Sequence, residues 1–215
     1  ATTSDAQLVA FFRDPLKAAR DAFAANQYQH AVSIYEQILH LRPNHREALA
    51  EVGTLWLKAG KPKVALTHFV NLLTLLNHTK DQLFNVLLNI TQCYFDMKQY
   101  QLAYIMTHQA LFAKAGKDGL RANSKDDAIL STKALMAKAL RLNGDAASAR
   151  MILVGNLQTF EDHNLSLDEY GRALEALQQP IEALRVYLKM LVLHMNNPDL
   201  KEHFASVLKH KEAFK

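Results

Sequence analysis

The chain has 215 residues, of which 49% are hydrophobic and 21% are charged, and these proportions exclude a disordered chain. Only 7 Gly and 5 Pro occur, which are too few for the many turns of a β-sandwich or barrel, so an all-helical protein is predicted. The formal net charge of +4 comes from 25 basic and 21 acidic residues that are interspersed rather than gathered in one stripe. Nucleic acid is therefore not an expected partner.

Local signals predict where the helices begin and end. A short helix is expected at residues 6–12, and the first long break is at Pro43. Proline cannot continue a helix and biases Arg42 out of the α region, so the following helix is expected to fold back beside its predecessor. Two further breaks between paired helices are predicted at residues 59–60 and 143–144, where a glycine ends the helical pattern.

Later boundaries are marked by side chains that favour helix ends. Ser124 with Asp127, and Ser166 with Glu169, have the spacing of a capping box and predict two helix starts. The stretch 113–127 is an insertion that is either an extended helix or a charged loop.

A last helix is predicted after residue 197, with one apolar stripe and a charged opposite face, which suits the cap of a repeat array. The stripe consists of Leu200, Phe204, Val207 and Leu208.

A small residue recurs in the second helix of each predicted pair, at Ala31, Ala65, Ala103, Ala149 and Ala183. The spacings are 34, 38, 46 and 34 residues, which is a period of 34 with insertions of 4 and 12. The preceding helix of each pair also has a small residue, at Ala19, Gly53, Thr91, Ala137 and Gly171. Small residues at these places would let the two helices of a pair approach closely.

The clearest repeat, "REALAEVGTLWLKAGKPKVALTHFVNLLTLL", resembles the tetratricopeptide repeat (TPR) family. The residues that fall on family positions are Gly53, Trp56, Gly60, Ala65 and Phe69, and Pro43 closes the repeat before it. The resemblance covers about residues 12–195. It implies an all-α fold, a right-handed α-α superhelix (TPR solenoid) of about five helix pairs with capping helices.

The resemblance also implies the organisation of the chain. We expect a single domain over residues 1–215, with repeats at 12–45, 46–79, 84–117, 130–163 and 164–197 and a capping helix at 198–214. Departures from the family pattern are Thr107 in place of an aromatic residue, and Asn77 and Ala115 in place of a closing proline.

By the same resemblance, the chain is a non-catalytic scaffold or adaptor that binds a partner protein or peptide in a concave groove lined by the first helices. The groove positions are Arg20, Phe23, Glu47, Thr54, Asn85, Asn89, Gln92, Phe95, Lys138 and Arg141. Amide side chains can bond a peptide backbone, and cations can bind a carboxylate. Phe23 and Phe95 are either anchors for the partner or packing residues of the next repeat.

The remaining aromatic residues at repeat-packing positions are expected in the core, namely Trp56, Phe69, Tyr94 and Tyr187. The carboxylate clamp that some TPR members use for chaperone tails is not matched, because Leu16, Arg20 and Glu51 stand at its first positions. We therefore expect no binding of Hsp70 or Hsp90 tails.

Chemistry-bearing motifs do not point to an enzyme. The 10 His residues form no metal-binding motif, and the single Cys93 lies among apolar neighbours and is predicted to be buried. No cofactor and no metal are expected. No apolar run approaches the ~18 residues that span a bilayer.

Two alternatives to groove binding stay open. The first is a self-assembling solenoid, a dimer or filament held by Phe11, Phe12 or the last helix, and the second is a His-dependent metal site or enzyme. The chain begins at Ala1 rather than at a methionine, which predicts a processed form or an excerpt of a longer protein. On that ground we expect a role in a bacterial envelope assembly or secretion system, in the periplasm or envelope, with the cytoplasm as the alternative.

Overall fold

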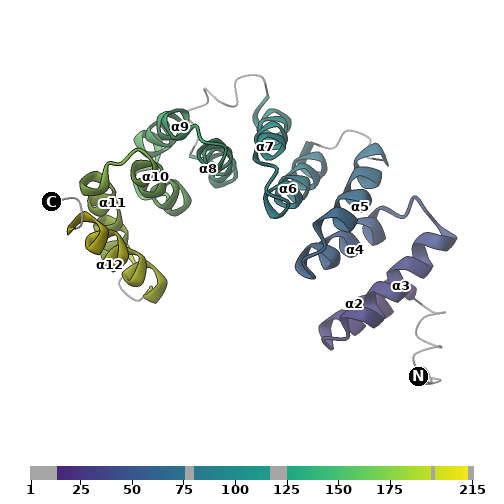
Figure 1. Cartoon of the computed structure of the whole chain (residues 1–215). Coiled ribbons are helices and arrows are strands. Elements are labelled where there is room, and N and C mark those ends of the chain that lie inside the picture. Colours follow the sequence, from purple (N-terminus) through teal and green to yellow (C-terminus); the bar gives the residue numbers. More distant parts are fainter. Residues whose placement is uncertain (1–13, 76–79, 117–124, 195–196, 213–215) are drawn as a thin grey trace. The chain divides into compact units, whose positions relative to one another are not determined.

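The computed structural model describes residues 14–75, 80–116, 125–194 and 197–212. Within these ranges the chain forms eleven α-helices and no β-strand, which confirms the all-α prediction (Figure 1). The chain divides into two compact units, Ala1–Lys98 and Gln99–Lys215. The helix expected at 6–12, with Phe11 and Phe12, lies outside the described residues, and the single domain stays a prediction.

Unit 1 is built from consecutive helices that each pack on the next one. They are α2 (Pro15–Ala24), α3 (Tyr28–Leu41), α4 (Arg46–Lys58), α5 (Pro62–Leu75) and α6 (Lys80–Asp96). The break predicted at Pro43 falls between α3 and α4, and the break at residues 59–60 falls between α4 and α5.

Unit 2 continues the same pattern, and α10 also packs on α8. Its helices are α7 (Tyr100–Ala115), α8 (Asp127–Leu142), α9 (Ala146–Thr159), α10 (Asn164–Ala176), α11 (Pro180–Leu193) and α12 (Pro198–Glu212). The repeat predicted at 84–117 contributes α6 to unit 1 and α7 to unit 2. In the predicted insertion, α7 extends to Ala115 and residues 117–124 lie outside the described ranges.

The small residues identified from the repeat are all buried. All five second-helix alanines are completely buried, with exposed fractions of 0%. Gly53 is packed against the ring of Phe69, and Gly171 is packed against the ring of Tyr187. There is no room for a side chain at either place, since an added Cβ would lie 2.8 Å from Cε1 of Phe69 at Gly53 and 2.5 Å from Cζ of Tyr187 at Gly171. Both rings are fully buried, and in these two pairs the helices approach closely at the small residue, as predicted.

The turn within each helix pair contains one residue with a positive φ angle, at Asn26, Gly60, Lys98, Gly144 and Gln178. Each of them lies five residues before the packing alanine of its pair. At Gly60, the next backbone N–H, from Lys61, donates to the carbonyl of Trp56 at 2.9 Å, which is the 6→1 bond of a Schellman motif. The same backbone conformation therefore recurs at this turn in every repeat, including those in which the turn residue is not glycine.

Two sequence expectations about helix caps need correction. The N-cap of α8 is Asp126, whose side chain accepts from the N–H of Ala128, while Ser124 lies outside the described residues. The N-cap of α10 is His163, so Ser166 lies inside the first turn and is not the cap. His163 can cap α10 because its Nδ1 accepts the backbone N–H of Ser166, as the oxygen of a serine at the N-cap position would.

The core prediction for aromatic residues holds only in part. Phe69 and Tyr187 are fully buried, whereas Trp56 and Tyr94 are each partly exposed. The partial exposure of Trp56 arises because one side of its ring borders a surface hollow.

Candidate functional site

The predicted groove residues of α2 and α4 form an ion-pair network. The guanidinium of Arg20 donates to the carboxylate of Glu51 through Nε at 3.0 Å and through Nη2 at 2.5 Å, and to Glu47 at 3.3 Å. The hydroxyl of Tyr35 on α3 donates to the other oxygen of Glu51 at 2.6 Å. Glu51 raises the pKa of Arg20, and burial followed by the bond to Glu51 raises the pKa of Tyr35.

This network changes the role of Arg20. A guanidinium that is already held by two carboxylates is not a free cation for a partner. Glu51 was not among the predicted groove residues, although it joins α2, α3 and α4. The repeat period could have predicted this ion pair. Arg20 and Glu51 are 31 residues apart, about one helical turn less than the 34-residue period, so they face each other from neighbouring first helices.

Phe23 lies next to the network and is half-buried. Its ring meets the ring of Tyr28 edge-on at 5.6 Å, and Nζ of Lys58 lies 5.2 Å from its centroid. A hollow of about 330 Å³ opens on the side of Tyr28 and a second of about 220 Å³ opens on the side of Arg20. We call this region the Phe23 surface, and its residues are Phe23, Tyr28, Val32, Leu55, Trp56, Lys58 and Lys61.

The remaining predicted groove residues of unit 1 differ in how exposed they are and in whether their side chains already have hydrogen-bond partners. Asn85 is exposed and Asn89 is partly exposed, whereas Gln92 is exposed but donates to Asp96 at 2.7 Å. The hydroxyl of Thr54 donates to the carbonyl of Ala50 within its own helix at 2.8 Å.

Phe95 is 8% exposed, so its side chain is buried. Of the two interpretations for this residue, burial favours packing over contact with a partner.

In unit 2, the two predicted groove residues lie on α8. Lys138 is partly exposed. Arg141 donates to one oxygen of Glu169 on α10 through Nε at 3.0 Å and Nη2 at 2.8 Å, and the exposed fractions of the two side chains are 15% and 10%. Arg141 therefore joins neighbouring first helices, as Arg20 does in unit 1, and is not a rim cation.

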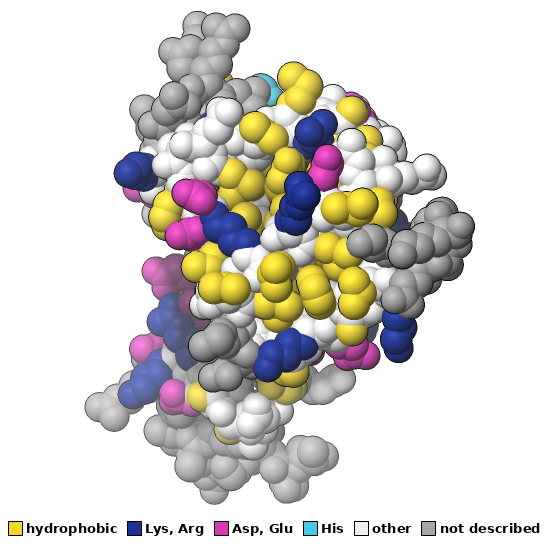
Figure 2. Space-filling model, turned by 90° about the vertical axis from the view of Figure 1, so that its left-hand side faces the viewer, with side chains coloured by type: hydrophobic (Ala, Val, Ile, Leu, Met, Phe, Trp, Pro, Cys, Tyr) yellow, Lys and Arg dark blue, Asp and Glu magenta, His cyan; other side chains and the backbone are white. Residues whose placement is uncertain are grey.

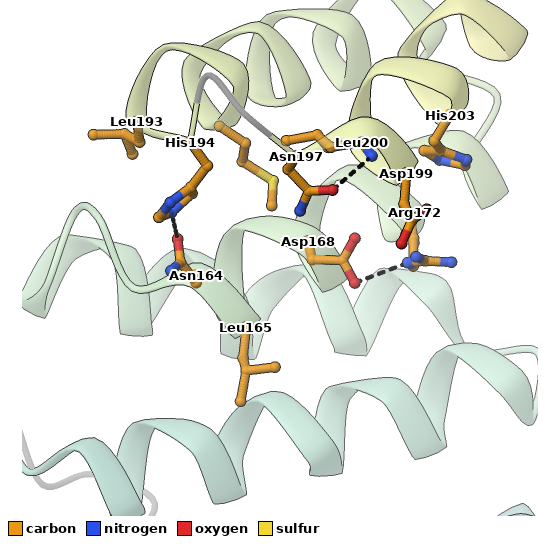
Figure 3. Close-up of a pocket in the computed structure, with 11 residues that line it drawn as sticks. Asn164, Leu165, Asp168, Arg172, Leu193, His194, Asn197, Asp199, Leu200 and His203 are labelled. Carbon is orange, nitrogen blue, oxygen red and sulfur yellow. Dashed lines mark hydrogen bonds and ion pairs between the residues drawn. The ribbon is translucent and has the colours of Figure 1, made fainter.

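A hollow of about 760 Å³ in unit 2 lies between α10, the end of α11 and the start of α12 (Figure 3). Several of its polar side chains have hydrogen-bond or ion-pair partners. Asp168 pairs with Arg172 at 3.0 Å, and Asn197 accepts from the N–H of Leu200 at 3.1 Å. His194 lies within hydrogen-bonding distance of Asn164 at 2.5 Å.

A buried polar network surrounds the start of α10. Nδ1 of His163 accepts from the backbone N–H of Ser166 at 3.2 Å, and Nε2 lies 3.3 Å from Oδ1 of Asp127. Asn156 donates to Oγ of Ser166 at 3.0 Å. Because Ser166 and His163 are 0% and 4% exposed, a substrate cannot reach the hydroxyl, so this Ser–His–Asp arrangement is structural.

We predict that unit 2 loses stability when the pH falls below about 6.5. Burial lowers the pKa of His163 from its ordinary 6.5, against a smaller opposing effect of Asp127. The unfolded chain therefore takes up the proton at a higher pH than the folded chain. The stabilisation is complete above about pH 6.5 and is lost as the pH falls through the lowered pKa of the folded state.

The measurement is the free energy of urea unfolding between pH 7.5 and 5 for the wild type and for His163→Asn. An asparagine can still cap α10 but does not titrate, so the variant should show a flatter pH dependence. His68 in unit 1 also has a pKa lowered by burial, so the difference between the two proteins is the informative quantity. Equal slopes would contradict the prediction.

Metal and thiol chemistry find little support among the described residues. Within them, no group of three His, Cys, Asp or Glu side chains is placed to hold a metal ion. Cys93 is fully buried as predicted, and burial raises the pKa of its thiol to about 11. A thiol of that pKa is almost entirely protonated at neutral pH and is a poor nucleophile.

Comparison with known proteins gives a fold match without a sequence match. No protein-family model and no curated protein matches the chain. MamA from Desulfovibrio magneticus RS-1, from residue 41 to its end, has a TM-score of 0.66 at 17% identity, covering 86% of this chain and 98% of that chain. YrrB, described as a TPR protein with an unusual peptide-binding site, has a TM-score of 0.65 at 14% identity, covering 98% and 100%.

A third match agrees with these two. A thermophilic TPR protein from Thermus thermophilus has a TM-score of 0.58 at 20% identity, covering 91% of this chain and 98% of that chain. The chain has the TPR fold. Gly53 and Phe69, which the resemblance placed on family positions, are in contact in the structure, and Gly171 and Tyr187 make the equivalent contact in unit 2.

None of the helices in the described ranges combines the length and the hydropathy that a bilayer crossing requires.

Proposed function

We propose that the chain is a non-catalytic protein-binding module that receives a partner segment on its first helices. The observation that carries this proposal is the Phe23 surface. An aromatic ring that is only half-buried, with a hollow on each side, offers apolar area to a partner at little cost in folding. The exposed amide of Asn85 and the partly exposed amide of Asn89, on α6 of the same unit, supply donors and acceptors for a peptide backbone.

We expect Phe23→Ala to weaken the complex by ~2 kcal/mol or more, about thirty-fold in Kd, if the ring is a hot spot. The partner is first captured from the native cell by a photo-crosslinking residue placed at position 85 and then purified. Its affinity is measured by calorimetry for the wild type, Phe23→Ala and Asn89→Ala.

The matched control is Met151→Ala, because Met151 is 77% exposed on α9, a second helix. It should leave the affinity unchanged. If Phe23→Ala and Asn89→Ala also leave it unchanged while circular dichroism shows both variants folded, the groove assignment is wrong.

Self-association is a second candidate, and a specific feature of α11 favours it. Figure 2 shows a face of the molecule on which hydrophobic side chains gather, with Lys and Arg side chains between them. On α11, three large apolar residues are exposed at helical spacing, Ile181 at 53%, Leu188 at 54% and Val192 at 68%. Exposed apolar residues at this spacing on a surface helix are typical of a contact with another chain.

Light scattering at two protein concentrations tests this candidate. If a second copy covers the stripe, the mass should rise with concentration for the wild type and not for Leu188→Glu. The control is Leu165→Glu, a change of the same kind at a 48% exposed residue on α10. A monomer at every concentration would exclude the dimer.

A further inference from the structure

The two hollows of the Phe23 surface are parts of one feature. Phe23, Leu55 and Lys58 line both of them, so the ring of Phe23 stands as a partition between a larger hollow of about 330 Å³ and a smaller one of about 220 Å³. Together they have room for one or two large apolar side chains rather than for a folded domain.

The floor of the larger hollow is apolar and aromatic. Leu55 is buried, Val32 and Trp56 are partly exposed, and Tyr28 is 51% exposed with its hydroxyl bonded to Asn26 at 2.9 Å. The buried Nε1 of Trp56 has no hydrogen-bond partner among the described residues, so one donor next to the hollow is unused. Such a donor is costly to leave unpaired and is usually satisfied by a bound oxygen.

Two lysines lie over these rings. Nζ of Lys58 is 5.2 Å from the centroid of Phe23, and Nζ of Lys61 is 4.7 Å from the centroid of Trp56. Neither lysine forms an ion pair with a described residue. The neighbouring Arg20, in contrast, is neutralised by Glu51 and Glu47. The available charge at the Phe23 surface is therefore positive and belongs to Lys58 and Lys61.

We propose that the Phe23 surface binds an acidic protein segment that carries a large apolar side chain. The apolar side chain would enter the larger hollow against Trp56 and Phe23. Carboxylates on either side of it would pair with Lys58 and Lys61, which stay attached to the rings by cation–π contacts. This inference rests on the proposed function and specifies the chemistry of the partner.

Single-stranded nucleic acid would also combine aromatic stacking with cations, but the surface suits it less well. A nucleic-acid backbone needs a track of cations, whereas the residues that define the Phe23 surface include two, Lys58 and Lys61. An acidic segment needs only two cations on one side of an apolar anchor, and that is what the Phe23 surface offers.

The chain carries its own reporter for this site, because Trp56 is its single tryptophan. The experiment titrates the full chain with a capped twelve-residue peptide of Glu and Ser that has one central Phe, and follows the fluorescence of Trp56. Two matched peptides replace every Glu with Gln or the Phe with Ser. We expect saturable binding of the Glu/Phe peptide, weakening as salt is added, and at least about five-fold weaker binding of both matched peptides.

Protein variants test which residues are responsible. The double variant Lys58→Gln/Lys61→Gln should weaken binding of the Glu/Phe peptide by about ten-fold and abolish its salt dependence. Phe23→Ala should weaken binding with the salt dependence retained. Lys209→Gln, a change at an exposed lysine of α12, is the control and should behave like the wild type.

Two results would overturn the inference. One is an affinity for the Glu/Phe peptide that is the same for the wild type and for Lys58→Gln/Lys61→Gln, or no saturable binding. The other is tighter binding of oligothymidine than of the peptide. If the crosslinked partner binds through Asn89 while the peptide does not bind, the proposed function stands and only this inference fails.

Discussion

Gly171→Ala is expected to destabilise unit 2 by about 3 kcal/mol, at the upper end of the range for overpacking a core. A Cβ at residue 171 would lie 2.5 Å from Cζ of Tyr187 and 2.8 Å from its hydroxyl oxygen. The ring cannot move aside easily, because it is 0% exposed and its hydroxyl donates to the carboxylate of Glu175. Glu175 is held in turn by His203 at 3.0 Å.

The chain provides two matched comparisons for this substitution. At Gly155 on α9, no heavy atom lies within 4 Å of the added Cβ, so Gly155→Ala should stabilise the helix by ~0.5–1 kcal/mol. At Gly53, the nearest atom is Cε1 of Phe69 at 2.8 Å, so the effect of Gly53→Ala should be destabilising and smaller than at Gly171.

Urea unfolding followed by circular dichroism measures all three variants, and the fluorescence of Trp56 reports on unit 1 separately. For Gly171→Ala, the loss should appear in the circular dichroism transition of unit 2, with a smaller effect on Trp56. A variant as stable as the wild type would show that the ring of Tyr187 can move, and that the close approach of α10 and α11 is not required.

The second large effect is expected from breaking the ion pair between Arg141 and Glu169. Arg141→Met should destabilise unit 2 by ~2–3 kcal/mol, because it leaves the carboxylate of Glu169, which is 10% exposed, without its cation. The value is below the roughly 3–5 kcal/mol typical of fully buried pairs, since both groups keep some contact with solvent.

The double variant Arg141→Met/Glu169→Leu separates the charge from the packing. With no buried charge left, most of the lost stability should return, as it does when apolar residues replace a buried pair. The control is Arg172→Ala, which breaks the pair with Asp168 on the surface of α10 and should change the stability by less than ~1 kcal/mol. If the double variant is no more stable than Arg141→Met, the loss comes from packing rather than from the stranded charge.

The repeat was predictable because its determinants are local in sequence. Helix breaks at Pro43 and at Gly60 and Gly144, together with a small residue every 34 positions or so, indicate paired helices before any contact is known. The structure confirms both the pairs and the buried alanines. Helix capping was less predictable, since Ser166 has the favoured residue type, yet His163 three residues earlier makes the capping bond.

The candidate site depended on contacts that the sequence pattern did not specify. Arg20 and Arg141 were predicted as groove cations, but each meets a carboxylate from the next first helix, and the pairing removes its free charge. Phe23 and Phe95 hold equivalent places in their repeats, yet only Phe23 stays partly exposed. Periodicity determines which face of a helix a residue occupies. Burial and charge on that face depend on the side chains that the neighbouring helices bring to it, so only the tertiary structure decided them.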